Sequence, residues 1–270
     1  MQVIILCGGK GTRLREETEN KPKPLVEVGG KPILWHIMKI YSHYGFNDFV
    51  LCLGYKGDMI KDYFVNHSSS ESDFTFDSKT KECLSHGPNS IENWTITFAN
   101  TGQETLTAAR IKQVEKYITE DTFHVTYGDV IADIDISALV RQHNEVGTIG
   151  VMTGIHGRLK RETIKAKGSI ITEFKQELEI DDIVNGGFMV FKKEFFTYLT
   201  KNCMLEETLS DLVKDRQLGL YYHGGFWENM NTYQEVEKLN KLCEAGTPPW
   251  YIWEKGKKMN CPTAEELEDT

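Results

Sequence analysis

The first half of the sequence alternates apolar, strand-like segments with segments of helical periodicity. Strand-like runs occupy residues 3–6, 48–54, 95–102 and 122–130. Helix-like segments occupy residues 32–44, 59–67 and 107–118, between those runs. Such an alternation is typical of parallel βαβ units, in which each strand is followed by a helix that returns the chain to the same sheet edge. We therefore expect an α/β fold.

The helix at 32–44 carries the clearest signal. Its apolar residues recur at helical spacing, Pro32 suits a first helical turn, and Gly45 ends the pattern. Residues 68–94 break the periodicity with Ser, Asp, Asn and Gly, so we expect an irregular insertion there, either a lid or a hairpin.

The second half of the sequence predicts further strands and helices. We expect strands at 148–153, 169–174, 186–191 and 218–223. We expect helices at 136–146, 192–200, 205–216 and 232–245. The acidic end, AEELEDT, is interpreted as a solvated tail.

Charge and cysteine content narrow the class of protein. The chain has 270 residues, 40% of them hydrophobic, and a net charge of −9. This balance disfavours a nucleic-acid binder, because phosphate contacts need a basic surface. No apolar run approaches the length of a membrane span, and six cysteines without a Cys-x-x-Cys pair indicate free thiols. We expect a cytoplasmic protein without a membrane or nucleic-acid partner, in which any phosphate site is local.

The stretch LCGGKGTRL at 6–14 follows the first apolar run directly. Three glycines there leave backbone N–H groups unshielded, so an anion can approach closely, and the loop is predicted to hold phosphates. An ordinary glycine-rich turn is the alternative. Two known phosphate loops do not fit: a dinucleotide fingerprint would need glycine at Leu14, and Lys10 is misplaced for a P-loop.

The strand-like run at 122–130 has a second polar position near its end, where Asp129 follows Gly128. Ligands of open α/β sheets bind at the carboxyl ends of the strands. The glycine loop and Asp129 are therefore predicted to lie on the same edge of the sheet.

Longer motifs carry a resemblance to a known family. GGKGTRLREET followed by KPKPLVEVGGKPILWHIMKIYSHYG is similar to the sugar nucleotidyltransferase family. Further similarity lies in GYKGDMIKDYF, NTGQETLTAARIK, YGDVIADIDI, VNGGFMVF and GGFWENMNT, so that it spans roughly residues 1 to 254. REET and KPKPLVEV favour the cytidylyl branch of that family over the thymidylyl branch.

The resemblance implies a fold and a reaction. The fold would be a Rossmann-like, mixed and mostly parallel sheet flanked by helices, of the nucleotide-diphospho-sugar transferase type. It would form a single domain over 1–254, with 68–94 as its insertion or lid and 255–270 as a tail. The reaction would join CTP to a phosphorylated acceptor, expected to be glucose 1-phosphate, and release pyrophosphate with Mg²⁺ as cofactor. A homo-oligomer is a further expectation.

The family's functional residues fall on identifiable positions of this sequence. Those matching catalytic residues are Arg13 and Lys23. The nucleotide-binding set is Leu6, Gly8, Gly9, Gly11, Thr12, Arg13, Lys23, Thr101, Arg110 and Gly128. The set that would bind the acceptor is Tyr127, Arg158, Lys175, Asn185 and Gly186. The metal ligands would be Asp129 and Asn231.

Three positions depart from the family pattern. Asn231 replaces a metal-binding aspartate, and its amide oxygen can ligate a hard cation but brings no charge, unless Glu228 compensates. Residues 176–178 read Gln-Glu-Leu in place of a Glu-Lys-Pro whose lysine holds the sugar phosphate, which leaves Lys175 and Arg158 as the nearby cations. The family's YGDG is YGDV here.

These departures leave three hypotheses. The first is a glucose-1-phosphate cytidylyltransferase with a modified metal site. The second is a cytidylyltransferase for another phosphorylated or phosphonate acceptor, since the altered positions lie on the acceptor side. The third is a weakly catalytic, nucleotide-binding regulator. Retention of Arg13, Lys23 and Asp129 favours an enzyme.

Overall fold

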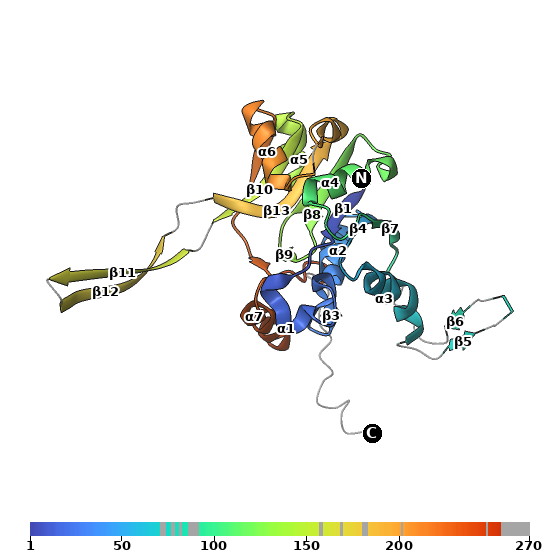
Figure 1. The fold of residues 1–270 in the computed structure, drawn as a ribbon, viewed down its shortest axis with the longest axis horizontal. Helices are drawn as coiled ribbons and strands as arrows, with labels where there is room; N and C mark the ends of the chain where they lie inside the picture. Colours follow the sequence, from blue (N-terminus) through green and yellow to red (C-terminus); the bar gives the residue numbers. More distant parts are fainter. Residues whose placement is uncertain are drawn as a thin grey trace, which may run out of the picture.

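The protein is described by a computed structural model covering residues 1–70, 74–76, 79–80, 83–85, 92–156, 159–167, 170–179, 183–200, 202–246 and 248–254. Within these residues a seven-stranded central sheet has the order β14-β10-β13-β8-β1-β4-β7 (Figure 1). The strands are β1 (Val3–Cys7), β4 (Asp48–Leu53), β7 (Thr95–Asn100), β8 (Thr122–Tyr127), β10 (Gly150–His156), β13 (Ile183–Lys192) and β14 (Leu218–His223). Only β13 runs antiparallel to its two neighbours among these strands. The mixed, mostly parallel sheet is confirmed.

Strand β1 separates two hydrophobic cores. Val3 and Ile5 face the first core, Ile4 and Leu6 face the second, and all four are buried. The first core receives buried side chains from α2 (Ile33–His43), α3 (Gly57–Ser70), α5 (Ile136–Val146) and α7 (Tyr233–Glu244). The second receives them from α4 (Thr107–Gln113) and α6 (Leu205–Lys214). Because β1 is covered on both faces, its sequence is a continuous apolar run and not an alternating one.

Several predicted elements have different boundaries in the structure, and three of them are interrupted or change type. The helix expected at 107–118 ends at Gln113 and continues as the 3-10 helix η3 (Glu115–Tyr117). The helix expected at 192–200 is the 3-10 helix η4 (Lys193–Thr197). The strand expected at 122–130 ends at Tyr127, and β9 (Val130–Ala132) leaves the central sheet to pair with β15 (Trp227–Asn229). Local periodicity does not reveal the first and third of these breaks, because apolar residues recur on both sides of them, at Ile111 and Val114 and at Tyr127 and Val130.

Several short elements were not expected. These are η1 (Thr12–Leu14), α1 (Arg15–Thr18), η2 (Lys23–Leu25), β2 (Glu27–Val28) and β3 (Lys31–Pro32). Pro32 therefore ends a strand and directly precedes α2 instead of lying in its first turn. Strands β11 (Leu159–Lys167) and β12 (Ile170–Glu179) form a two-stranded antiparallel ribbon that projects from the body (Figure 1), where the sequence predicts only a strand at 169–174.

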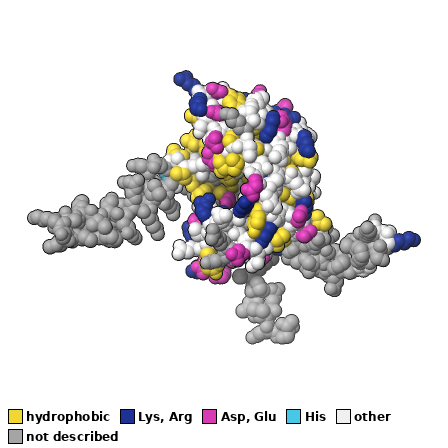
Figure 2. Space-filling view, in the orientation of Figure 1, with side chains coloured by type: hydrophobic (Ala, Val, Ile, Leu, Met, Phe, Trp, Pro, Cys, Tyr) yellow, Lys and Arg dark blue, Asp and Glu magenta, His cyan; other side chains and the backbone are white. Residues whose placement is uncertain are grey.

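The segment 68–94 contains the end of α3 and a short antiparallel pair, β5 (Phe74–Phe76) and β6 (Cys83–Ser85). Most of its other residues lie outside the described part of the chain. No helix among the described residues is long and apolar enough to cross a membrane. Four described cysteines, Cys7, Cys52, Cys203 and Cys243, are free thiols as predicted. Basic and acidic side chains are interspersed on the face shown in Figure 2.

Candidate active site

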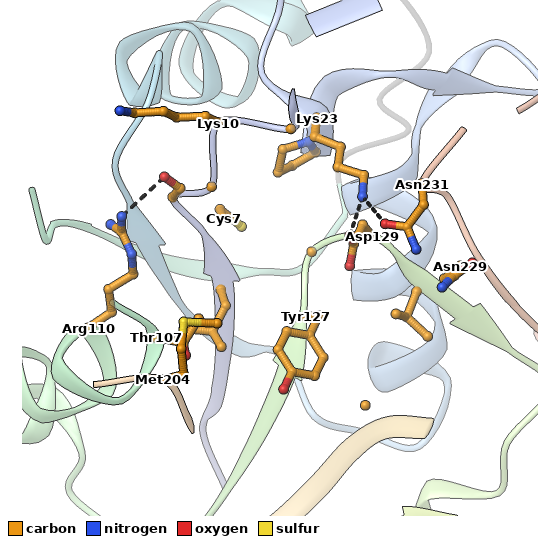
Figure 3. A pocket seen from close by; sticks show the side chains of 18 of the residues that line it. Cys7, Lys10, Lys23, Thr107, Arg110, Tyr127, Asp129, Met204, Asn229 and Asn231 are labelled. Carbon is orange, nitrogen blue, oxygen red and sulfur yellow. Dashed lines mark hydrogen bonds and ion pairs between the residues drawn. The ribbon is translucent and has the colours of Figure 1, made fainter. Parts of the chain in front are cut away.

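A cavity of about 700 Å³ opens at the carboxyl ends of β1 and β8. Both the glycine loop, residues 8–13, and Asp129 line it, so the predicted meeting of these two segments at one sheet edge is observed. Figure 3 shows Arg110 on one side of this cavity, Asn231 on the other and Tyr127 between them.

The three loop glycines have different structural roles. A Cβ at Gly9 would meet nothing within 4 Å, so this position faces open space in the cavity. A Cβ at Gly8 would overlap the guanidinium of Arg110, so Gly8 makes room for a side chain of the protein itself. Gly11 has φ +62, and a Cβ there would lie 2.8 Å from Thr18 Cγ2. Only Gly9 therefore offers the unshielded approach that the sequence predicts for all three.

Arg110 joins three strand ends. Its guanidinium donates to Leu53 O at the end of β4, to Gly8 O in the glycine loop, and to Thr101 Oγ1 and Gly102 O after β7. The side chain is 4% exposed, and burial lowers its pKa. A guanidinium carries five N–H donors in a fixed planar arrangement, which suits several carbonyl groups at once. Arg110 therefore holds these three strand ends together in the wall of the cavity.

Lys23, Asp129 and Asn231 form a hydrogen-bonded cluster. Lys23 Nζ donates to Asp129 Oδ2 at 2.5 Å and to Asn231 Oδ1 at 2.8 Å (Figure 3). Lys23 begins η2, a turn closed by hydrogen bonds from Leu25 N to Pro22 O and from Val26 N to Lys23 O. The ammonium group thus occupies a position between a carboxylate and an amide oxygen, which shows that these two oxygens can bind a cation together.

The pairing of β9 with β15 brings Asn231 to Asp129 across about a hundred residues of sequence. Asn229 pairs with Val130, and Met230 N donates to Asp129 O at 2.9 Å. Glu228, which the sequence offered as a compensating carboxylate, pairs instead with Lys238 of α7. Within the described residues, no group of three His, Cys, Asp or Glu side chains could hold a metal ion.

The cavity is also lined by Tyr127, Asn185, Glu206 and Trp227. Tyr127 Oη donates to Glu206 Oε1 at 2.8 Å, and Trp227 Nε1 donates to Gly186 O at 2.8 Å. Burial, together with the charge of Glu206, raises the pKa of Tyr127. The phenol is therefore a hydrogen-bond donor and not a base.

Most predicted site residues line the same cavity. These are Leu6, Gly8, Gly9, Gly11, Thr12, Arg13, Lys23, Arg110, Tyr127, Gly128, Asp129, Asn185 and Asn231. Thr101 is 2% exposed and acts behind the wall as a partner of Arg110, and Gly186 likewise contacts Trp227 through its carbonyl. Lys175 lies on β12, paired in register with Thr163, and Arg158 lies outside the described residues.

Sequence reasoning missed several cavity residues. They include Cys7, Gln103, Thr107, Met204, Glu206, Trp227 and Asn229. Trp227 and Asn229 stand in the motif GGFWENMNT, which carries the resemblance but contributes only Asn231 and Glu228 to the predicted site. Glu206 comes from the second residue of α6, and no local pattern distinguishes it from the neighbouring Glu207.

Comparison with known proteins identifies the family to which this chain belongs. The sequence model of the family described as Nucleotidyl transferase matches residues 2–229. The chain is 44% identical over 256 residues to a probable glucose-1-phosphate cytidylyltransferase of Bacillus subtilis, covering 94% of this chain and all of the relative. It is 38% identical over 258 residues to a glucose-1-phosphate cytidylyltransferase of Salmonella typhimurium, with 94% and 100% covered.

Among solved structures, a UTP-bound UGPase of Acinetobacter baumannii shares the fold, with a TM-score of 0.67 at 13% identity over 94% of this chain and 96% of that one. The chain belongs to the nucleotidyl transferase family, and it is an enzyme of the sugar nucleotidyltransferase type. The resemblance found in the sequence is confirmed.

Proposed function

We propose that this enzyme transfers the cytidylyl group of CTP to glucose 1-phosphate, giving CDP-glucose and pyrophosphate. The observation that carries the proposal is the position of Lys23 Nζ between Asp129 and Asn231, at the edge of the cavity that the glycine loop lines. Two relatives of nearly full length, at 44% and 38% identity, bear the name glucose-1-phosphate cytidylyltransferase and support this choice of nucleotide and acceptor.

The proposed reaction joins two anions. An oxygen of the acceptor phosphate forms a bond to the α-phosphorus of CTP, and the bond between that phosphorus and the oxygen bridging to the β-phosphate breaks. The electron pair leaves with pyrophosphate. Catalysis of such a transfer consists mainly of positioning the reactants and neutralising their charge. A protein nucleophile is not needed, and burial of Cys7 in the cavity wall raises the pKa of its thiol, which keeps it neutral.

The glycine loop and three basic residues have proposed roles in this reaction. The glycine loop accepts the triphosphate, whose approach is open at Gly9. Arg13 neutralises the leaving pyrophosphate. Lys23 releases the oxygens of Asp129 and Asn231 and contacts the α-phosphate and the acceptor phosphate. The rigid turn of η2 limits the entropy lost in holding this side chain in place. Arg110 holds the segment 101–103 in place beside the nucleotide.

The family uses a divalent cation, and we propose Mg²⁺ in this chain. Mg²⁺ is commonly bound by one or two protein oxygens, phosphate oxygens and water. Asp129 Oδ2 and Asn231 Oδ1 fit that requirement, because they already share one cation, the Lys23 ammonium. When bound, Mg²⁺ would neutralise charge on the transferring phosphate.

We further propose that residues 1–254 act as one domain; the tail predicted at 255–270 lies outside the described residues. Trp250 and Ile252 are buried in the first core, which supports a domain end after them. The enzyme is proposed to work in the cytoplasm as a homo-oligomer. Leu220 and Tyr222, exposed on the edge strand β14, offer an apolar contact surface. Light scattering, and activity of a chain ending at residue 254, test these points.

Pyrophosphate release with each of the four common NTPs and a set of acceptors tests the proposed reaction. The set contains glucose 1-phosphate, other sugar 1-phosphates and small phosphonates. We expect turnover with CTP and glucose 1-phosphate in Mg²⁺, and loss of turnover in Asp129→Asn. Turnover with a phosphonate alone would instead establish the second hypothesis. CTP binding without turnover of any acceptor would establish a regulator.

A further inference from the structure

Two hydrogen bonds fix polar side chains that line the cavity. Gly187 N donates to Asn185 Oδ1 at 2.9 Å. The Tyr127 hydroxyl donates to Glu206 Oε1 at 2.8 Å. Three elements, β13, β8 and α6, supply these side chains. The direction of both bonds is fixed, because a backbone N–H can only donate and an ionised carboxylate can only accept.

This direction determines what each side chain can offer a ligand. Because Asn185 Oδ1 accepts from the backbone, its Nδ2 group is the part of the amide that can donate to a ligand. An ionised carboxylate has about four lone-pair sites, and the bond from Tyr127 uses one of them. Asn185 thus retains a donor and Glu206 retains acceptors, and both residues line the cavity.

An aromatic wall lies beside this pair. Trp227 lines the cavity, and its ring is held by the hydrogen bond from Nε1 to Gly186 O. An amphipathic aromatic ring next to a donor and an acceptor suits a ligand that has apolar C–H faces and several hydroxyl groups. A sugar ring has both.

We infer that Glu206 is a specificity-determining residue for the acceptor, whose carboxylate accepts a hydrogen bond from a ring hydroxyl of the sugar while Asn185 donates to another. The inference rests on the proposed function and extends it to a residue that no sequence motif indicates. It also orients the acceptor: a phosphate group is repelled by Glu206 and attracted by Lys23, so the phosphate lies toward Lys23 and the hydroxyls lie toward α6.

Glu206→Gln and Glu206→Ala test this role, with Glu207→Gln as the matched control. Glu207 belongs to the same helix and is also exposed. It caps α6 by accepting a hydrogen bond from Met204 N at 3.1 Å. The Glu207 variant therefore reports effects on the helix alone. A hydrogen bond to a charged group accounts for about tenfold to a hundredfold in affinity. We expect both Glu206 variants to raise KM for glucose 1-phosphate by about tenfold or more, with the calorimetric Kd for CTP unchanged.

Monodeoxy analogues of glucose 1-phosphate identify the contact itself. One analogue should lose at least tenfold in kcat/KM with the unaltered enzyme, and in Glu206→Ala the same analogue should react as well as glucose 1-phosphate. Equal losses for every analogue in both proteins, or the same KM effect in Glu207→Gln, would overturn the inference alone. Absence of turnover by the unaltered enzyme with every sugar 1-phosphate would remove the proposed function, and the inference with it.

Discussion

Lys23 Nζ lies 2.5 Å from Asp129 Oδ2, although the two residues are 106 positions apart in the sequence. Their side chains are 12% and 27% exposed, so solvent screens this pair less than a surface pair. The contact joins the turn after the glycine loop to the loop that follows β8. In the proposed reaction, phosphates and a metal ion separate these partners when they bind, and this makes the neighbouring Asn231 a sensitive position.

Asn231→Asp should lower the Mg²⁺ concentration needed for half-maximal activity several-fold. A second carboxylate beside Asp129 attracts a hard cation more strongly than a neutral amide does. Pyrophosphate release measured over a Mg²⁺ titration checks this. Asn229→Asp, which adds the same charge to another position of the cavity wall, is the control and should have a smaller effect. An unchanged Mg²⁺ dependence in Asn231→Asp would place the metal elsewhere.

Gly9→Val should weaken CTP binding at least tenfold while the protein stays folded. The added side chain enters open cavity space and excludes phosphate. Valine at Gly11 would be strained by φ +62, so a loss of CTP affinity there could result from a loss of stability. Calorimetry with CTP and thermal unfolding are the measurements. Gly224→Ala is the control, because its Cβ also meets nothing closer than 3.5 Å and lies outside this cavity. Normal CTP affinity in a folded Gly9→Val would contradict the phosphate role of the loop.

Arg110→Met should lower the free energy of unfolding by about 1–3 kcal/mol and weaken CTP binding. The change removes the donors that Arg110 supplies to Gly102 O and Gln103 O, and one of the donors to Leu53 O and Gly8 O, which keep hydrogen bonds from Thr101 N and Tyr55 N. Urea unfolding and calorimetry check the two effects. Arg141→Met is the control, since Arg141 makes an exposed ion pair with Asp135 at 3.5 Å, and such pairs contribute little. Equal stability of the two variants would show that Arg110 does not hold these strand ends.

His36 should make stability fall as pH decreases from 7 to 5. Burial lowers the pKa of His36 to about 4, and its neutral ring bonds Val28 O through Nε2 and accepts from Trp250 Nε1 through Nδ1. The unfolded chain, with a histidine pKa near ~6.5, binds the proton first, so stability is present above pH ~6.5 and is lost below it. This amounts to about 2 kcal/mol at pH 5.

His36→Gln should therefore lose about 2 kcal/mol less than the unaltered protein between pH 7 and 5. The comparison uses the pH dependence and not the absolute stability, because the variant also loses packing against Trp250. Urea unfolding at the two pH values is the measurement. Equal pH dependence in both proteins would mean that folding does not lower the pKa of His36.

Local sequence determined the fold class, the glycine loop and the strand ends that carry Asp129. Backbone hydrogen bonding and side-chain burial repeat every few residues, so their signal is visible in short windows, as in the continuous apolar run of β1 and the helical spacing of α2. Family motifs added Lys23, Arg110, Asn185 and Asn231, which line the cavity together.

Only the tertiary structure decided which of these residues meet. The β9–β15 pairing brings Asn231 to Lys23 and turns Glu228 toward Lys238, and the guanidinium of Arg110, not a ligand, occupies the space beside Gly8. The same packing brings Glu206 of α6 to Tyr127, while the adjacent Glu207 caps the helix. These contacts join residues far apart in the sequence, and a short window contains no information about partners that only the packing of separate elements brings within hydrogen-bonding distance.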